Sequence, residues 1–106
     1  MELLTLEVVT PRGGFLHEEN LTEIVLRRRE DRFDPGSEVA VFPSHGPMLV
    51  RLPTCDIRFR HDGRMGHLRV HGGFAEVIDD VVTVITPQAE RPAPLAGTGR
   101  VSNVMS

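Results

Sequence analysis

The sequence predicts an all-β protein, a flattened antiparallel β-sandwich or barrel of about 8–10 short strands. Apolar and polar residues alternate with a period of two through much of residues 4–86. Turn-forming residues recur at intervals of about ten residues, which is typical of sandwiches and barrels. No segment before Pro87 repeats its apolar residues at helical spacing.

The first part of the chain contains two predicted strands and a short apolar pair. Residues 4–8 alternate, and the strand stops at Thr10-Pro11 because proline lacks the backbone N–H that a sheet requires. Gly13-Gly14 predicts a turn into the apolar pair at residues 15–16. Residues 22–28 then alternate with a period of two and form the next strand.

A densely charged segment, residues 29–36, separates that strand from the next. It ends in Asp34-Pro35-Gly36, a strong turn signal, and we expect an extended hairpin loop. Residues 39–42 form a short buried strand that ends at an irregular crossing, residues 43–47. Apolar residues resume at 48–52.

The stretch from Arg58 to Thr86 predicts a meander of three strand-like runs. Asp62-Gly63 suits a two-residue hairpin turn, because glycine has no Cβ and aspartate tolerates positive φ values. Gly72-Gly73 marks a point where the strand bends or approaches a neighbour closely. Further strands flank a second short turn at Asp79-Asp80.

These patterns divide the chain into a β-domain at residues 1–86 and a flexible C-terminal tail at residues 87–106. The tail contains too few periodic apolar residues to form a core of its own. We expect no C-terminal helical hairpin in it.

Composition limits the classes of function. The chain has 106 residues, 25% of them charged, and a net charge of −3, which is the profile of a small globular protein and disfavours nucleic acid as a partner. Cys55 is the only cysteine, so an internal disulfide cannot form, and we interpret it as a small strand or turn residue. No run approaches the roughly 20 apolar residues of a membrane span, so we expect no membrane insertion.

The sequence offers little support for catalysis or metal binding. The phosphate-loop, nucleophile-elbow and zinc-helix motifs are absent. His67 and His71 would lie roughly 13 Å apart on one strand, too far to share an ion. His61 and His67 flank the Asp62-Gly63 turn, but two exposed imidazoles without a carboxylate are usually solvated. We therefore predict no catalytic residue, no metal site and no cofactor.

Arg27-Arg28-Arg29 is the one basic run. It is either a solvated strand end balanced by Glu30 and Asp31 or a charged contact with a partner.

Four segments together resemble one known family. They are Val8–Pro11, Phe42–Leu49, Val70–Val77 and Val82–Val84, the second reading Phe-Pro-Ser-His-Gly-Pro-Met-Leu and the third Val-His-Gly-Gly-Phe-Ala-Glu-Val. Their order and spacing resemble the N-terminal domain of the ε subunit of F-type ATP synthases. In that family the second motif usually reads Pro-Gly-His-Ala-Pro-Leu-Leu.

The resemblance implies a non-catalytic rotor subunit of the central stalk, which couples ion transport to ATP synthesis or hydrolysis. Its expected partners are the γ subunit and the membrane c-ring, with the α and β subunits reached only indirectly. Glu38 matches the acidic residue that contacts basic ring loops, while Thr10, His45 and Val50 match positions on the γ-facing side. The implied location is peripheral, on the cytoplasmic face of the bacterial inner membrane.

Two of these residues also have a simpler interpretation. Glu38 could be a solvated turn residue and His45 a hydrogen-bonding residue of its turn. The stretch from Arg27 to Gly36 is longer and far more charged than the family's usual loop, which suggests a divergent branch such as an alternative F-type ATPase. The family's C-terminal helical hairpin, which inhibits hydrolysis, has no counterpart in residues 87–106. Whether the transported ion is a proton or sodium is left open.

Two other functions are compatible with a small β-protein, because a fold does not fix a function. A stand-alone β-sandwich module that binds a ligand or peptide should show a concave pocket, whereas a stalk subunit should show an apolar patch on one sheet face. A metalloenzyme barrel would need His61, His67 or His71 inside with a carboxylate.

Overall fold

The computed structural model describes residues 2–31, 33 and 35–91, and within them it contains strands and no helix, which confirms the predicted fold class. The number of strands also falls within the predicted range. The eight strands are β1 (Leu4–Thr10), β2 (Gly13–Leu21), β3 (Glu23–Arg28), β4 (Ser37–Val41), β5 (Met48–His61), β6 (Arg64–Ile78), β7 (Val81–Ile85) and β8 (Ala89–Glu90).

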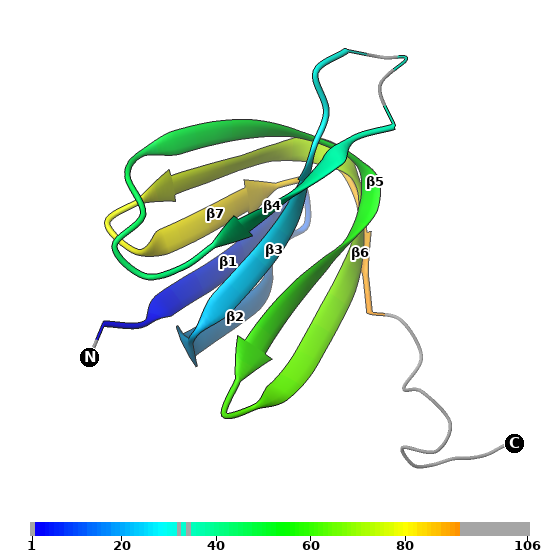
Figure 1. Ribbon diagram of the computed structural model, residues 1–106. Helices are drawn as coiled ribbons and strands as arrows, with labels where there is room; N and C mark the ends of the chain where they lie inside the picture. The colour runs from blue at the N-terminus through cyan, green and yellow to red at the C-terminus, as the bar shows by residue number, and fades with distance from the viewer. Residues whose placement is uncertain (1, 32, 34, 92–106) are drawn as a thin grey trace, which may run out of the picture.

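The strands form one open, strongly bent sheet in the order β2-β1-β7-β6-β5-β3-β4, with β8 paired to β6 (Figure 1). All neighbours are antiparallel except β1 and β7, which run parallel. Turn signals predict the pairing of consecutive strands only, so they give no information on this contact between the two ends of the chain.

The long strands β5 and β6 pass through both layers of the sandwich. One half of each pairs within the layer that contains β7, β1 and β2, and the other half lies beside β3, β4 and β8 (Figure 1). The buried positions change parity between Leu52 and Pro53 on β5, and at Gly72–Gly73 on β6. A strand that bends from one layer into the other must turn its opposite face to the core, and this explains the change.

Glycine is required at this bend. Gly72 and Gly73 have φ values of 83° and 114°, in the region that side chains rarely adopt. A Cβ on Gly73 would clash with the carbonyl oxygen of Ile85 and lie 2.9 Å from Thr86 Cα. The buried Thr86 hydroxyl contacts the carbonyl oxygens of Gly72 and Gln88 at 2.7 and 3.1 Å. The predicted bend at the glycine pair is therefore confirmed.

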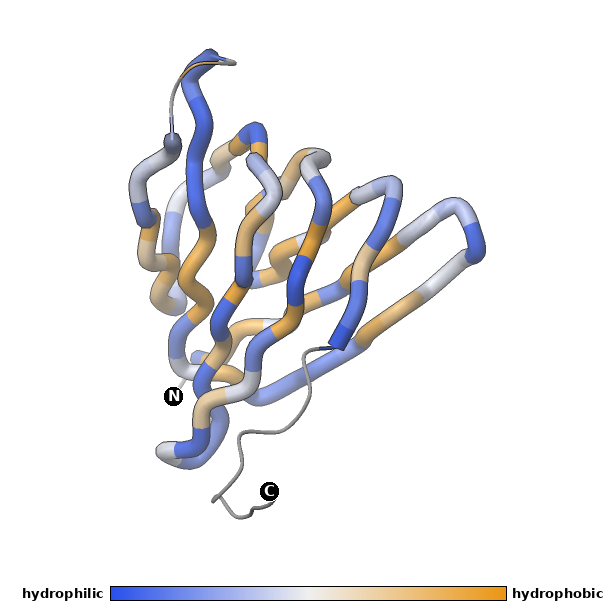
Figure 2. Tube along the Cα trace, turned by 90° about the vertical axis from the view of Figure 1, so that its right-hand side faces the viewer, coloured by the Kyte–Doolittle hydropathy of each residue, from blue (hydrophilic) through white to orange (hydrophobic). Residues whose placement is uncertain are grey.

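The core lies between the layers and is almost entirely aliphatic. The hydropathy of the chain alternates along the strands, as the sequence pattern predicts (Figure 2). Its largest fully buried side chains are Leu4, Leu6, Leu21, Ile24, Leu26, Ile57 and Leu68. Burial of each such side chain stabilises the fold by about 1.5–3 kcal/mol.

Two hairpin turns match their sequence signals. Asp62 and Gly63 have φ values of 50° and 74°, and Asp79 and Asp80 have φ values of 50° and 64°. Positive φ at both central residues is the turn geometry that fits the twist of a two-residue hairpin. The charged segment between β3 and β4 also forms the expected hairpin connection.

The first turn differs from its prediction. It is formed by Pro11 and Arg12, while Gly13 already pairs with Thr10 as the first residue of β2. The Thr10 Oγ1 accepts a hydrogen bond from the Arg12 N–H at 3.2 Å and closes the turn. The turn itself is therefore made by Pro11 and Arg12, and Gly13, with a φ of 108°, starts the following strand.

The sheet continues past the predicted domain boundary at residue 86. Ala89 and Glu90 pair with Val70 and Arg69 of β6, and the His71 N–H donates to the Gln88 carbonyl oxygen at 3.0 Å. The rest of the predicted tail, residues 92–106, lies outside the described part of the chain.

Candidate functional site

The outer face of the β1-β7-β6-β5 layer carries most of the exposed large apolar side chains. Residues on these strands alternate between core and surface, so the outward set follows from the register. Phe74 pairs with Ile85 and Ile78 pairs with Val81 across β6 and β7. The side chains that define this apolar face are Leu49 (71% exposed), Phe74 (51%), Ile78 (46%), Val81 (38%) and Ile85 (60%).

An acidic row crosses the apolar face. Glu7 on β1, Thr83 on β7 and Glu76 on β6 are register partners in one line, which ends at Leu49 on β5. His17 on the edge strand β2 contacts Glu7 and lies 2.6 Å from a Glu19 carboxylate oxygen. This face therefore presents apolar side chains with negative charge between them.

A shallow hollow of about 320 Å³ lies at one margin of the apolar face. Pro47, Met48, Leu49, Glu76 and Ile78 line it. Apolar patches of this kind, where several large side chains of one sheet face are exposed, mark surfaces that meet other proteins.

The three predicted γ-contact residues lie in different environments. Thr10 is half-buried at the end of β1, where its hydroxyl closes the first turn. His45 is half-buried in the loop before β5, and its Nδ1 lies 2.7 Å from the Gly46 carbonyl oxygen, a contact expected of a turn residue. Val50 is 2% exposed and belongs to the core. Its neighbour Leu49 presents the apolar surface at this point of β5, because adjacent strand residues face opposite sides.

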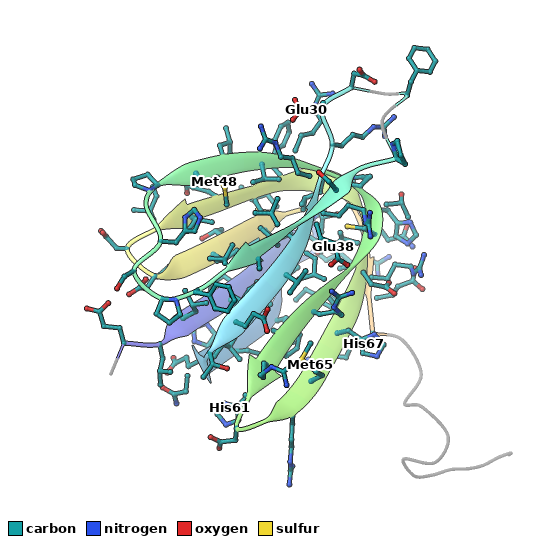
Figure 3. The ribbon with its side chains drawn as sticks, in the orientation of Figure 1. Glu30, Glu38, Met48, His61, Met65 and His67 are labelled. Atoms are coloured by element: carbon teal, nitrogen blue, oxygen red, sulfur yellow. The ribbon has the colours of Figure 1, made fainter. Side chains whose placement is uncertain are left out.

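Glu38, the predicted ring contact, lies on the outer face of the opposite layer (Figure 3). Its carboxylate contacts Arg58 at 2.9 Å and Arg27 at 3.6 Å. Arg27 also donates from Nη1 to the Gly36 carbonyl oxygen at 3.0 Å. The carboxylate is thus shared by two arginines and does not present an uncompensated negative charge.

Ion pairs continue across this face. Arg60 contacts Glu23 at 3.5 Å and Arg69 contacts Asp56 at 3.2 Å, while His71 Nε2 lies 2.5 Å from Glu90. These pairs are not predicted by the sequence pattern. The sequence does show that Arg58 and Arg60 alternate with apolar residues on one strand, so both arginines should lie on the outer face. Turn signals alone do not show which strands lie beside that strand, so the acidic partners could not be assigned.

The remaining histidines make local contacts. His61 Nδ1 lies 3.0 Å from the Asn20 carbonyl oxygen and its Nε2 lies 3.3 Å from Asp62. His67 is half-buried on β6 beside Arg58. Within residues 2–31, 33 and 35–91, no three His, Cys, Asp or Glu side chains are placed to hold one metal ion. The same residues contain no helix that is long and apolar enough to cross a bilayer.

Cys55 is buried on β5 within the core cluster. Burial raises the pKa of its thiol, and the nearby Arg27 opposes that effect only in part. A buried neutral thiol is a poor nucleophile, so the side chain acts as a small core residue.

Comparison with known families decides the classification. The model of the ATP synthase delta/epsilon chain β-sandwich domain matches residues 3–92. This chain belongs to that family. The delta/epsilon chain match spans all eight strands, including the short β8 pairing beyond residue 86.

Curated relatives of this delta/epsilon chain agree with the classification. It is 38% identical over 91 residues to the ATP synthase epsilon chain of Nitratidesulfovibrio vulgaris, covering 83% of this chain and 60% of that protein. It is 34% identical over 89 residues to the epsilon chain of Syntrophobacter fumaroxidans, covering 84% of this chain and 61% of that protein. The chain therefore spans about three fifths of the length of these relatives.

Two solved structures share the fold. A chain of the Euglena gracilis mitochondrial ATP synthase OSCP/F1/c-ring structure superposes with a TM-score of 0.73 at 20% identity, covering 92% of this chain and 59% of that one. A chain of the Tetrahymena thermophila ATP synthase central stalk and c-ring structure gives 0.65 at 14% identity, covering 86% and 69%.

Proposed function

We propose that this delta/epsilon family member is a non-catalytic central-stalk subunit of an F-type ATP synthase. It would hold the γ subunit and rest on the membrane c-ring, so that ion transport is coupled to ATP synthesis or hydrolysis. The curated relatives are ATP synthase epsilon chains, which supports the assignment. Its location would be peripheral, on the cytoplasmic face of the bacterial inner membrane.

The observation that carries the proposal is the apolar face. Five large side chains exposed on one sheet face are costly in water unless a partner covers them. A concave ligand pocket would have favoured the stand-alone module instead, whereas the hollow on this face is shallow. We assign the γ contact to this face, which includes Leu49 on β5, next to the predicted position Val50, and lies on the layer that also contains Thr10.

The c-ring contact would use the opposite outer face, around Glu38. The two layers bury their inner faces against one core, so their outer faces point in different directions. A rigid sandwich with two separate contact faces suits a part that passes torque between a stalk and a ring, because its interface must not unfold locally under load.

Co-purification from native membranes tests the proposal. The tagged full chain should recover the γ and ring subunits, identified by mass. Phe74→Gln with Ile85→Gln, a cross-strand pair on the apolar face, should lower the recovery of γ by at least about tenfold, since two large apolar side chains that γ would cover are removed. Met65→Gln, which changes a 44% exposed side chain on the other layer, is the matched control and should leave recovery unchanged.

Substitutions of Glu38 and His45 complete the experiment. A change in the recovery of ring subunits in Glu38 variants, and loss of γ in His45 variants, would support the residue assignments. Recovery of the chain alone, with no variant making a difference, would contradict the stalk role and favour the stand-alone binding module. A cleft of about 650 Å³ between the first turn and residues 87–89 would then be the first place to search for a ligand.

A further inference from the structure

A charged cleft of about 330 Å³ lies where the base of the β3–β4 hairpin meets β5 and β6. Its charged lining consists of three arginines and two carboxylates, contributed by Arg27, Arg58, Arg69, Glu38 and Asp56. The lining therefore carries one net positive charge, although the whole chain is acidic. Glu90 is the register partner of Arg69, but its carboxylate contacts His71.

The arginines are held in place by the carboxylates. Glu38 contacts both Arg58 and Arg27, and Arg27 is fixed a second time by the Gly36 carbonyl oxygen. Asp56 holds Arg69 at 3.2 Å. Because these contacts order the long side chains before any ligand arrives, less entropy is lost when the ligand binds.

The guanidinium groups retain unused donors. A guanidinium has five N–H groups, and in the described part of the chain Arg58 uses Nη2 toward Glu38. The side chains of Arg27 and Arg58 are 36% and 42% exposed, so the remaining donors are accessible from solvent. Planar donors of this kind fit a carboxylate with two parallel hydrogen bonds.

We propose that this cleft binds a carboxylate from an acidic segment of the partner that covers the Glu38 face, with Arg58 and Arg27 as direct ligands. Glu38 is then a positioning residue that orients both arginines. The inference rests on the proposed function for the identity of the partner, which is a protein of the membrane sector. It reverses the sign of the contact expected from the resemblance, in which Glu38 itself meets basic ring loops.

The isolated full chain tests the sign of the ligand without any partner. N-acetylated tetraglutamate and tetralysine would each be titrated at low salt, with the side-chain Nε–H signals of the arginines followed by NMR. We expect tetraglutamate to shift the signals of Arg27 and Arg58 and tetralysine to leave them in place. Shifts with tetralysine, or with neither peptide, would overturn the proposal.

Two charge variants of one ion pair sharpen the test. Arg58→Gln removes the positive excess of the cleft and should weaken tetraglutamate binding by about tenfold, the usual value of a charge-assisted hydrogen bond. Glu38→Gln keeps an acceptor for Arg58 while removing one negative charge from the cleft, so binding should strengthen by about threefold. Arg64→Gln is the control. Arg64 lies five residues along β6 from Arg69 and does not belong to the charged lining of the cleft. Weaker binding in the Glu38 variant would contradict this expectation and show that Glu38 helps binding more by orienting the two arginines than it hinders binding by repelling the ligand.

The same variants in the assembled complex separate this inference from the proposed function. Arg58→Gln should release the ring subunits at lower salt than the wild type, and Glu38→Gln should retain them to higher salt. If the wild type recovers no ring subunits, the proposed function fails while the peptide titration still decides the chemistry of the cleft. If it recovers them but the two variants respond in the opposite directions, the carboxylate proposal alone is wrong.

Discussion

The backbone of Gly73 lies so close to the carbonyl oxygen of Ile85 that a side chain has no room between them. This approach joins β6 to the end of β7 at the point where β6 bends from one layer into the other. The bend turns the outward side chains of the β6–β7 layer, including Phe74, to one common face. The glycine therefore lies where β6 begins to contribute outward side chains to the apolar face.

Gly73→Ala should severely destabilise the fold. The substitution combines a φ of 114° with a clash against backbone atoms, and we expect a loss of about 3 kcal/mol or more in the free energy of unfolding. Urea unfolding followed by circular dichroism measures it. Gly46→Ala is the control, since its Cβ meets no atom within 4 Å and should cost less than about 0.5 kcal/mol. Equal stability of the two variants would contradict this account of the bend.

Thr86→Val should also destabilise the bend, for a different reason. Valine has nearly the same shape but cannot hydrogen bond to the Gly72 and Gln88 carbonyl oxygens, which the buried hydroxyl contacts. Leaving such groups unsatisfied costs about 1–3 kcal/mol. Thr86→Ser keeps the hydroxyl and should retain more stability in the same unfolding experiment. A valine variant as stable as the wild type would show that the hydroxyl contributes nothing.

Ser44 should be replaceable by glycine with a gain in stability. It occupies the position of glycine in the family's Pro-Gly-His motif, and its φ of 69° explains that preference. Its N–H donates to Asp80 Oδ1 at 2.7 Å, and its hydroxyl contacts Glu2. We expect Ser44→Gly to stabilise by about 0.5–1 kcal/mol and Ser44→Ala to destabilise slightly, because alanine retains the strain and loses the hydroxyl contact. Thermal unfolding that places alanine above glycine would contradict this.

The folded state should become less stable at alkaline pH because of the buried thiol of Cys55. Burial raises the pKa of this thiol above its ordinary value, so the folded state keeps the proton at pH values where the unfolded state loses it. The stabilising contribution is complete below the unfolded pKa, about 8.5, and is lost as pH rises through the higher folded pKa. Unfolding measured from pH 7.5 to 10 should show this decline, and Cys55→Ala should lack the part of it due to the thiol. An unchanged pH dependence in the variant would exclude this role.

The sequence predicted the features that depend on local chemistry. Positive-φ turns at Asp62-Gly63 and Asp79-Asp80 were identifiable because few residues tolerate that geometry. The parallel contact of β1 with β7 and the pairing of Glu38 with Arg58 were not, since each joins residues that no turn connects. Val50, which the resemblance places on the γ-facing side, lies in the core. A family motif locates the strand, but the side that faces the core depends on the full register.

The proposal that Leu49, and not the buried Val50, contacts γ can be tested by truncating each side chain in turn. Val50→Ala removes buried methyl groups and should lower the free energy of unfolding by about 1–3 kcal/mol, without weakening the recovery of γ at a temperature where the variant is folded. Leu49→Ala, at 71% exposed, should leave stability within about 0.5 kcal/mol and reduce the recovery of γ. Urea unfolding and co-purification of the same two variants measure both effects. If Val50→Ala were the variant that lost γ while remaining folded, this part of β5 would have to open on binding and expose its core side.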